Sequence, residues 1–259
     1  MARPIYIPHY RGNGERRAYL EAAFAGSPLR PRFITAFDRE DLPPHAYAYD
    51  EADYRRMLAP IKDVLIGYAV GLFEAPLTPW AECVRQSRAA QRTLDEEFAR
   101  LPWLRPRALA AAEVSLALKH REAWRKVAEG VSDWAIIAED DILLSADSLR
   151  HLAAVTKRLP ADFDYVDIAG GCNLVPRAGD QQVNEYFFRI DPPRDRTTCC
   201  AIMRKAFARR LVRLGLPIVL PVDWTLTHAM GLLDAKVYWV KPLVFGHGSE
   251  MRVYASSLR

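Results

Sequence analysis

The sequence predicts an α/β fold in which a β-sheet is flanked by helices. Short apolar segments that are typical of strands alternate with longer segments of helical periodicity along most of the chain. Half of the 259 residues are hydrophobic and 26% are charged, so the chain can bury a substantial core and is not disordered. Strands resume after a proline-rich stretch at about residues 43–109. We therefore interpret that stretch as a helical insertion within one domain that spans residues 1–259.

The predicted elements alternate from the N-terminus onward. A strand at residues 4–8 leads through a Gly12–Asn13–Gly14 turn into a helix at 15–25, and a second strand follows at 32–37. The clearest helical pattern of the insertion covers residues 81–99. The later elements are a helix at 110–129, a strand at 134–138, a helix capped by Ser145, strands at 164–169 and 197–203, helices at 205–214 and 222–233, and a strand at 236–240.

The charge pattern argues against nucleic acid as a partner. The net charge is +4 and the arginines are spread along the chain without a long basic run. A mildly basic protein suits phosphate-containing ligands, and it is compatible with peripheral association with an anionic membrane surface. The N-terminus has no signal-peptide pattern, and no apolar run approaches the roughly 20 residues of a membrane helix. We therefore expect a cytoplasmic protein that can work at the inner face of the membrane.

The four cysteines predict reduced thiols. Cys83, Cys172, Cys199 and Cys200 have the spacing of neither a disulfide framework nor a zinc site. Cys199 and Cys200 are adjacent, so they point to opposite faces of any strand.

An acidic triplet gives the strongest local signal for a site. Glu139, Asp140 and Asp141 directly follow the apolar strand at 134–138, and open α/β sheets bind ligands at the carboxyl ends of their strands. In extended chain Glu139 and Asp141 project to one side and Asp140 to the other. Two carboxylates on one side can hold a hard divalent cation, and the alternative is a solvated acidic turn.

Two further patterns offer candidate side chains. Glu113, His120 and Trp124 lie on one stripe of the helix at 110–129, which either reaches a ligand pocket or packs a His–Trp pair into the core. Asp223 stands either as a first-turn acid of the helix at 222–233 or as a general base that faces a pocket.

Three arginines follow the first predicted strand. Arg11, Arg16 and Arg17 can pair with a nucleotide diphosphate, or they can form a solvated basic face of the next helix.

Taken in order, these segments resemble glycosyltransferase family 25, the lipopolysaccharide glycosyltransferases. The resemblance covers most of the chain outside about residues 47–110, and Lys119 stands where the family pattern usually has serine. The matching segments are Ile5 to Arg17, the acidic turn from Asp38 to Asp41, Glu113 with Leu118 to His120 and Trp124, Glu139 to Asp141, Thr197 to Ala206, Pro221 to Trp224, and Pro242 to Val244.

The resemblance implies a GT-A-like fold, Mn²⁺ or Mg²⁺, and a nucleotide-sugar donor, with UDP-galactose as the leading candidate among UDP-hexoses. It implies an acceptor sugar on lipopolysaccharide or another lipid-linked oligosaccharide, and we expect inverting transfer with Asp223 as the base. The expected metal ligands are Asp141, Glu139 and His247. The expected donor-binding residues are Arg11, Arg16, Arg17, Asp38, Glu113, His120, Glu139 and Asp140.

Residues 42–106 are the part least like the family, and we expect them to shape the acceptor site. Aromatic side chains there can stack on sugars and basic ones can meet phosphates. The aromatic candidates are Tyr47, Tyr49, Tyr54, Tyr68, Phe73 and Trp80, and the basic candidates are Arg55, Arg56, Lys62, Arg85 and Arg88. The alternatives for the whole chain are a catalytically inactive glycan-binding module and a nucleotide-sugar hydrolase.

Overall fold

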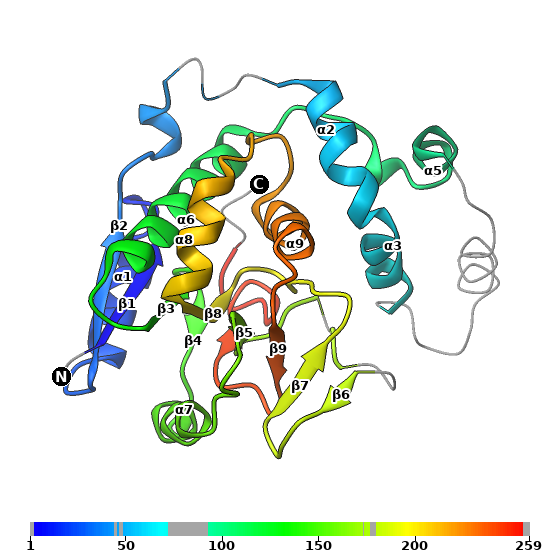
Figure 1. Cartoon of the computed structure of the whole chain (residues 1–259). Helices are drawn as coiled ribbons and strands as arrows, with labels where there is room; N and C mark the ends of the chain where they lie inside the picture. The colour runs from blue at the N-terminus through cyan, green and yellow to red at the C-terminus, as the bar shows by residue number, and fades with distance from the viewer. Residues whose placement is uncertain are drawn as a thin grey trace.

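A computed structural model confirms the α/β architecture and describes residues 3–43, 46, 49–71, 93–172, 174–176 and 180–255 (Figure 1). Its main sheet has eight strands in the order β2-β1-β3-β8-β5-β9-β7-β6. β1, β2 and β3 are parallel, whereas β8 runs antiparallel to both of its neighbours, β3 and β5. The strands are β1 (Arg3–Pro8), β2 (Leu29–Ile34), β3 (Trp134–Ala138), β5 (Tyr165–Asp167), β6 (Gln181–Gln182), β7 (Phe187–Ile190), β8 (Cys200–Arg204) and β9 (Val237–Val240). A second, two-stranded sheet pairs β4 (Ile142–Leu143) with β10 (Gly246–His247).

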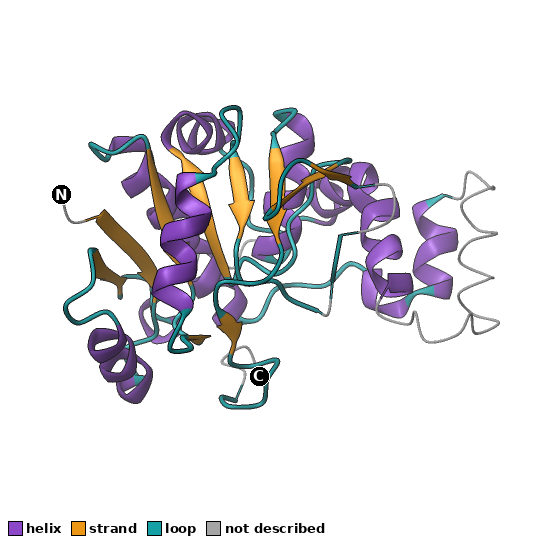
Figure 2. Cartoon of the chain, turned by 90° about the horizontal axis from the view of Figure 1, so that it is seen from below, coloured by secondary structure: helices purple, strands orange, loops and turns teal. Residues whose placement is uncertain are grey.

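Helices cover both faces of the main sheet (Figure 2). Alternate residues of β3 enter two separate cores, because successive side chains of a strand point to opposite faces. Ala135 and Ile137 pack with α6 (Ala111–Glu129), α8 (Lys205–Leu214) and α9 (Val222–Leu232). Ile136 and Ala138 pack with α1 (Gly14–Ala23) and α7 (Ser148–Lys157).

Two predicted boundaries are corrected by tertiary contacts. β2 ends at Ile34, three residues before the predicted end, because its parallel register with β1 runs from Leu29 to Ile34 and the chain then turns away. α7 begins at Ser148 with Asp147 as its N-cap residue, so the predicted cap at Ser145 is wrong. The Ser145 N–H instead donates to the Ser148 hydroxyl at 3.0 Å.

The described part of the insertion is helical and stands to one side of the sheet, beside α9 (Figure 1). Its helices are α2 (Glu51–Leu58), α3 (Lys62–Gly71) and α5 (Leu94–Arg100), with short 3₁₀ turns at Ala59–Ile61 and Pro102–Leu104. They share a third apolar core with Val219 and Leu220, just before α9. Most of the helix predicted at 81–99 lies outside the described residues. Within the described ranges, no helix has the length and apolar character needed to cross a membrane.

Candidate active site

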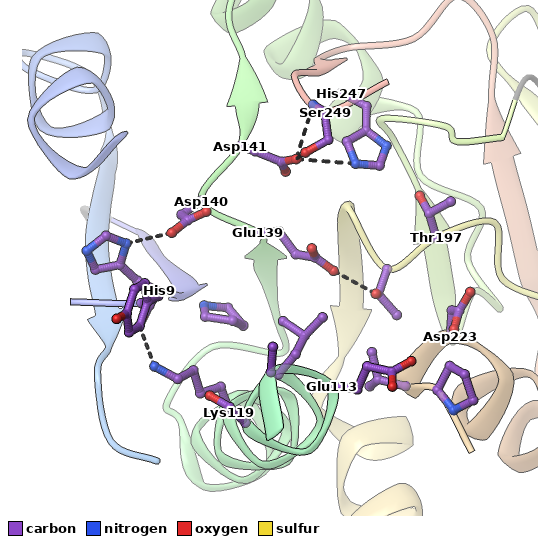
Figure 3. A pocket seen from close by; sticks show the side chains of 18 of the residues that line it. His9, Glu113, Lys119, Glu139, Asp140, Asp141, Thr197, Asp223, His247 and Ser249 are labelled. Atoms are coloured by element: carbon purple, nitrogen blue, oxygen red, sulfur yellow. Dashed lines mark hydrogen bonds and ion pairs between the residues drawn. The ribbon is translucent and has the colours of Figure 1, made fainter. Parts of the chain in front are cut away.

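A pocket of about 300 Å³ lies at the carboxyl end of β3 (Figure 3). Because β8 is antiparallel to β3, the residues before β8 reach the same edge of the sheet as the residues after β3. The N-terminus of α9 and the segment around β10 complete the wall. The pocket therefore collects Glu139, Asp140, Asp141, Thr197, Thr198, Asp223 and His247 from four separate parts of the chain.

The acidic triplet divides as the alternation predicts, with Asp140 directed away from its two neighbours (Figure 3). Asp140 is 6% exposed and its carboxylate is held by protein groups. It accepts hydrogen bonds from Arg16 Nη1 at 2.8 Å and Asn13 Nδ2 at 3.3 Å, and it lies 2.8 Å from His9 Nδ1. Burial opposes its ionisation, but His9 and Arg16 outweigh burial and lower the pKa of Asp140. Asp140 lines the pocket, and these contacts also join β1 and α1 to the triplet; its binding of the donor stays a prediction.

Glu139 is fixed by two neighbours. Its Oε1 accepts a hydrogen bond from the Thr198 hydroxyl at 2.8 Å and lies 3.3 Å from His120 Nε2. His120 is 1% exposed and does not line the pocket, so its predicted place at the donor is wrong. It packs with Trp124 and supports Glu139 from within the protein.

Thr198 is held in an unusual backbone conformation. Its φ of 55° lies in the left-handed region, which β-branched residues rarely adopt. The Thr198 N–H donates to Asp195 Oδ2 at 2.7 Å, and Asp195 also accepts from the Tyr165 hydroxyl at 2.7 Å. Burial, together with nearby Asp167, raises the pKa of Asp195 to about 8. Asp195 therefore positions Thr198, and Thr198 positions Glu139.

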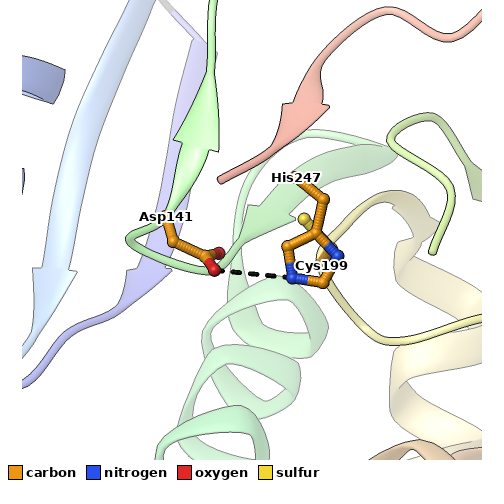
Figure 4. Close-up of side chains that lie close together, drawn as sticks. All are labelled: Asp141, Cys199 and His247. Carbon is orange, nitrogen blue, oxygen red and sulfur yellow. Dashed lines mark ion pairs between the residues drawn. The ribbon is translucent and has the colours of Figure 1, made fainter. Parts of the chain in front are cut away.

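Asp141 and His247 face one another across the second sheet (Figure 4). Asp141 Oδ2 lies 3.4 Å from His247 Nε2 and accepts a hydrogen bond from the Ser249 hydroxyl, whereas Asp141 Oδ1 is buried and has no partner among the described residues. Burial opposes ionisation of Asp141, but His247 and Ser249 outweigh it and lower its pKa. A buried carboxylate oxygen with no donor fits a cation.

Among the described residues, a group that could hold a metal ion is formed by Asp141, Cys199 and His247, whose ligand atoms all lie within 4.8 Å of one another. Glu139 was predicted as a ligand, but it is not in this cluster, because its Oε1 is turned to Thr198 and His120.

Asp223 enters the pocket from the first turn of α9 and is half-buried. Burial raises its pKa to about 6, although backbone N–H groups at the helix start act in the opposite direction. A carboxylate with that pKa is about 90% ionised at pH 7 and still accepts a proton readily. This environment is suited to a general base.

Two of the three predicted donor-binding arginines lie outside the pocket. Arg11 Nε donates to Asp38 Oδ2 at 2.5 Å, and Arg11 also pairs with Asp41. Arg17 pairs with Glu21 at 2.9 Å on the exposed side of α1. Arg16 alone of the three lines the pocket, and its charge is matched by Asp140.

Asp38 and Glu113, also predicted to bind the donor, have partners within the protein. Asp38 is 1% exposed, does not line the pocket, and accepts from Lys119 Nζ as well as from Arg11. Glu113 lines the pocket rim, but it is the N3 residue of α6, forms a bidentate pair with Arg107 at 2.6 and 2.7 Å, and accepts from the Ala110 N–H at 2.8 Å. Arg107 and that backbone bond lower the pKa of Glu113 despite its burial.

Of the acceptor residues predicted in the insertion, the structure describes the side chains of Tyr49, Tyr54, Arg55, Arg56 and Lys62. Tyr54 is 2% exposed and donates to the Leu104 carbonyl at 2.9 Å, so it belongs to the core and cannot stack on a sugar. Arg55 and Arg56 pair with acidic neighbours on α2 and α5. Tyr47, Phe73, Trp80, Arg85 and Arg88 lie outside the described residues, as does the side chain of Tyr68.

Several pocket residues were not predicted from the sequence. Lys119 Nζ donates to the His9 carbonyl at 2.5 Å and ties α6 to β1, and Thr198 orients Glu139. Ser249 and Glu250 contact Asp141 and His247 respectively. For Ser249 and Glu250, the sequence signal for a place in the pocket was their closeness to His247, because the glycines at 246 and 248 already indicated a tight loop there.

The pocket carries an excess of negative charge. Among the described residues, six carboxylates line it against three cationic side chains, and all three cations are paired with acids: Arg16 with Asp140, Arg39 with Glu40 and Lys119 with Asp38. A diphosphate can enter such a pocket only with a cation that balances its charge.

No protein-family model matches the sequence, and a search of curated proteins finds no match.

Proposed function

We propose that this chain is a metal-assisted, inverting glycosyltransferase of the family 25 type, with a GT-A-like nucleotide-sugar-binding sheet. Its donor is a UDP-hexose, with UDP-galactose as the leading candidate. Its acceptor is a sugar of lipopolysaccharide or a related lipid-linked glycan, which places the enzyme at the inner face of the membrane. The cofactor is a divalent cation, for which the family resemblance favours Mn²⁺ or Mg²⁺.

One observation carries this proposal. Asp223, which has the environment of a base, lines the same pocket as Asp141 and His247, which have the arrangement of cation ligands. The three residues come from α9, from the end of β3 and from β10, so tertiary structure alone brings them together. A base beside a cation site is what displacement of a diphosphate by a hydroxyl requires.

The chemistry divides between these groups. Asp141 and His247 would hold the divalent cation, which would supply positive charge to balance the diphosphate leaving group. Asp223 accepts the proton of the acceptor hydroxyl. The acceptor oxygen forms a bond to the anomeric carbon on the face opposite the diphosphate, while the bond from that carbon to the diphosphate oxygen breaks. Thr198 and His120 orient Glu139, which is placed to accept a hydrogen bond from a hydroxyl of the donor sugar.

The test is a panel of nucleotide-sugars incubated with Mn²⁺, with and without a lipopolysaccharide-core acceptor. We expect nucleotide diphosphate release that depends on acceptor and a product heavier by one hexose. Asp223→Asn should abolish release, whereas Asp234→Asn, which alters an exposed acid paired with Lys236, should leave it unchanged.

The same experiment separates the two rival functions. Release at an equal rate without acceptor would identify a nucleotide-sugar hydrolase. Binding of nucleotide, detected as a rise in melting temperature, without any turnover would identify an inactive glycan-binding module. Either result would overturn the proposal.

A further inference from the structure

We infer that Asp141, Cys199 and His247 form a site for a borderline transition-metal ion such as Zn²⁺ or Co²⁺, with the Cys199 sulfur as a ligand. This inference concerns the cation site of the proposed function and names the class of metal that binds there. It is argued from the chemistry and arrangement of the three ligand side chains. The three ligand atoms lie within 4.8 Å of one another (Figure 4).

Strand pairing holds the three ligands in place. The Glu139 N–H donates to the Cys199 carbonyl at 2.8 Å, which fixes the start of β8 beside the acidic triplet. His247 is paired with Ile142, the residue after Asp141, in the second sheet. The Gly248 N–H donates to the Asp141 carbonyl at 2.8 Å, and a Cβ at Gly248 would lie 2.5 Å from that oxygen. The backbone therefore brings the ligands together independently of any bound group.

The polar atoms of this cluster are arranged for a ligand that is not part of the chain. Asp141 is 4% exposed, and within the part of the chain that the structure describes its Oδ1 has no hydrogen-bond partner. His247 Nε2 faces Asp141 at 3.4 Å, while its Nδ1 lies 3.6 Å from Glu250 Oε1. A histidine that binds metal through one nitrogen commonly directs the other to a carboxylate, which orients the ring. Glu250 is the carboxylate close to this nitrogen, although His247 Nδ1 makes no hydrogen bond to any described residue.

The sulfur decides the metal class. Mg²⁺ and Mn²⁺ prefer oxygen ligands, whereas a carboxylate, an imidazole and a thiolate together suit Zn²⁺ or Co²⁺. A coordinating thiol loses its proton to the solvent when the ion binds. Neighbouring Asp141 and His247 atoms at 3.4 Å already have the separation of adjacent ligands in a tetrahedral shell of bonds of about 2.0–2.2 Å.

Cobalt spectroscopy tests this inference without relying on catalysis. Metal-depleted full-length protein is titrated with Co²⁺, and the near-ultraviolet spectrum is recorded. We expect a sulfur-to-cobalt charge-transfer band that saturates at one equivalent. Cys199→Ser should lose this band, whereas Cys200→Ser, which alters the adjacent buried thiol, should keep it. Binding of Co²⁺ by wild-type protein without the band would overturn the assignment, and this arm needs no variant to fold.

A competition experiment measures the preference directly. Wild-type protein should bind Zn²⁺ more tightly than Mn²⁺ by a ratio that falls at least tenfold in Cys199→Ser and is unchanged in Cys200→Ser. An equal ratio in all three proteins would contradict sulfur ligation. The outcome is separable from the proposed function, because Mn²⁺-dependent transfer without the cobalt band would refute only this inference. The band in a protein without transferase activity would refute only the function.

Discussion

Replacing Asp223 with asparagine should stabilise the protein at neutral pH and abolish the proposed transferase activity. Burial raises the pKa of this carboxyl from 3.8 to about 6, so the folded protein binds the proton more tightly than the unfolded chain does. The free energy of unfolding therefore falls as pH rises from about 4 to 6. Above pH 6 the destabilisation caused by ionised Asp223 stays constant. Two pKa units correspond to about 3 kcal/mol.

Asparagine keeps the shape of the side chain and removes the charge. The free energy of unfolding of Asp223→Asn should then exceed that of the wild-type protein by up to about 3 kcal/mol at pH 7.5. At pH 4 this difference should shrink to less than about 1 kcal/mol. Urea denaturation at both pH values measures it, and Asp234→Asn, an exposed acid, should change stability by less than about 1 kcal/mol.

Activity supplies the second readout for Asp223. The proposed transferase activity of the wild-type protein should show a kcat/KM that falls below about pH 6, approaching tenfold per pH unit, because Asp223, the proposed base, becomes protonated. A destabilised variant, or a gain that does not vary with pH, would refute the burial argument. A variant that retains transfer would refute the role of Asp223 as base.

Three further predictions follow from the contacts around the pocket. Lys119→Met should cost about 3 kcal/mol in urea denaturation, because it leaves the 1%-exposed Asp38 without one of its cations; a loss below about 1 kcal/mol would show that the pair is not stabilising. Thr198→Val removes the hydroxyl that orients Glu139 and should lower kcat about tenfold with a small change in melting temperature, so an unchanged kcat would contradict that positioning role. Asp141→Asn should weaken Mn²⁺ binding in calorimetry at least tenfold while the circular dichroism spectrum stays native, and undiminished binding would place the cation elsewhere.

Elements with strong local patterns were predicted correctly from the sequence. The strand at 134–138 and the helix at 205–214 match the structure residue for residue, since continuous apolar character and helical periodicity are local properties. The short strands β4, β6, β7 and β10 were missed, because two to four residues carry too little pattern and depend on a partner strand.

The candidate site was only partly accessible from the sequence. Local pattern was enough to single out the acidic triplet and its alternation, and Asp223 at the start of a helix, because both depend on neighbours in the chain. It could not assign partners to charged side chains. Arg11, Arg17, Asp38 and Glu113 have the right chemistry for a phosphate or sugar, yet each is matched by a protein group.

The composition of the candidate metal cluster was decided by tertiary structure alone. Cys199 is 58 residues from Asp141 and 48 from His247 in the sequence, and its spacing predicted no metal site. Antiparallel pairing of β8 with β3 and of β10 with β4 brings the three side chains together. Sheet register is set by packing across the whole core, so the sequence determined which chemical groups this protein carries, and only the fold determined which of them meet.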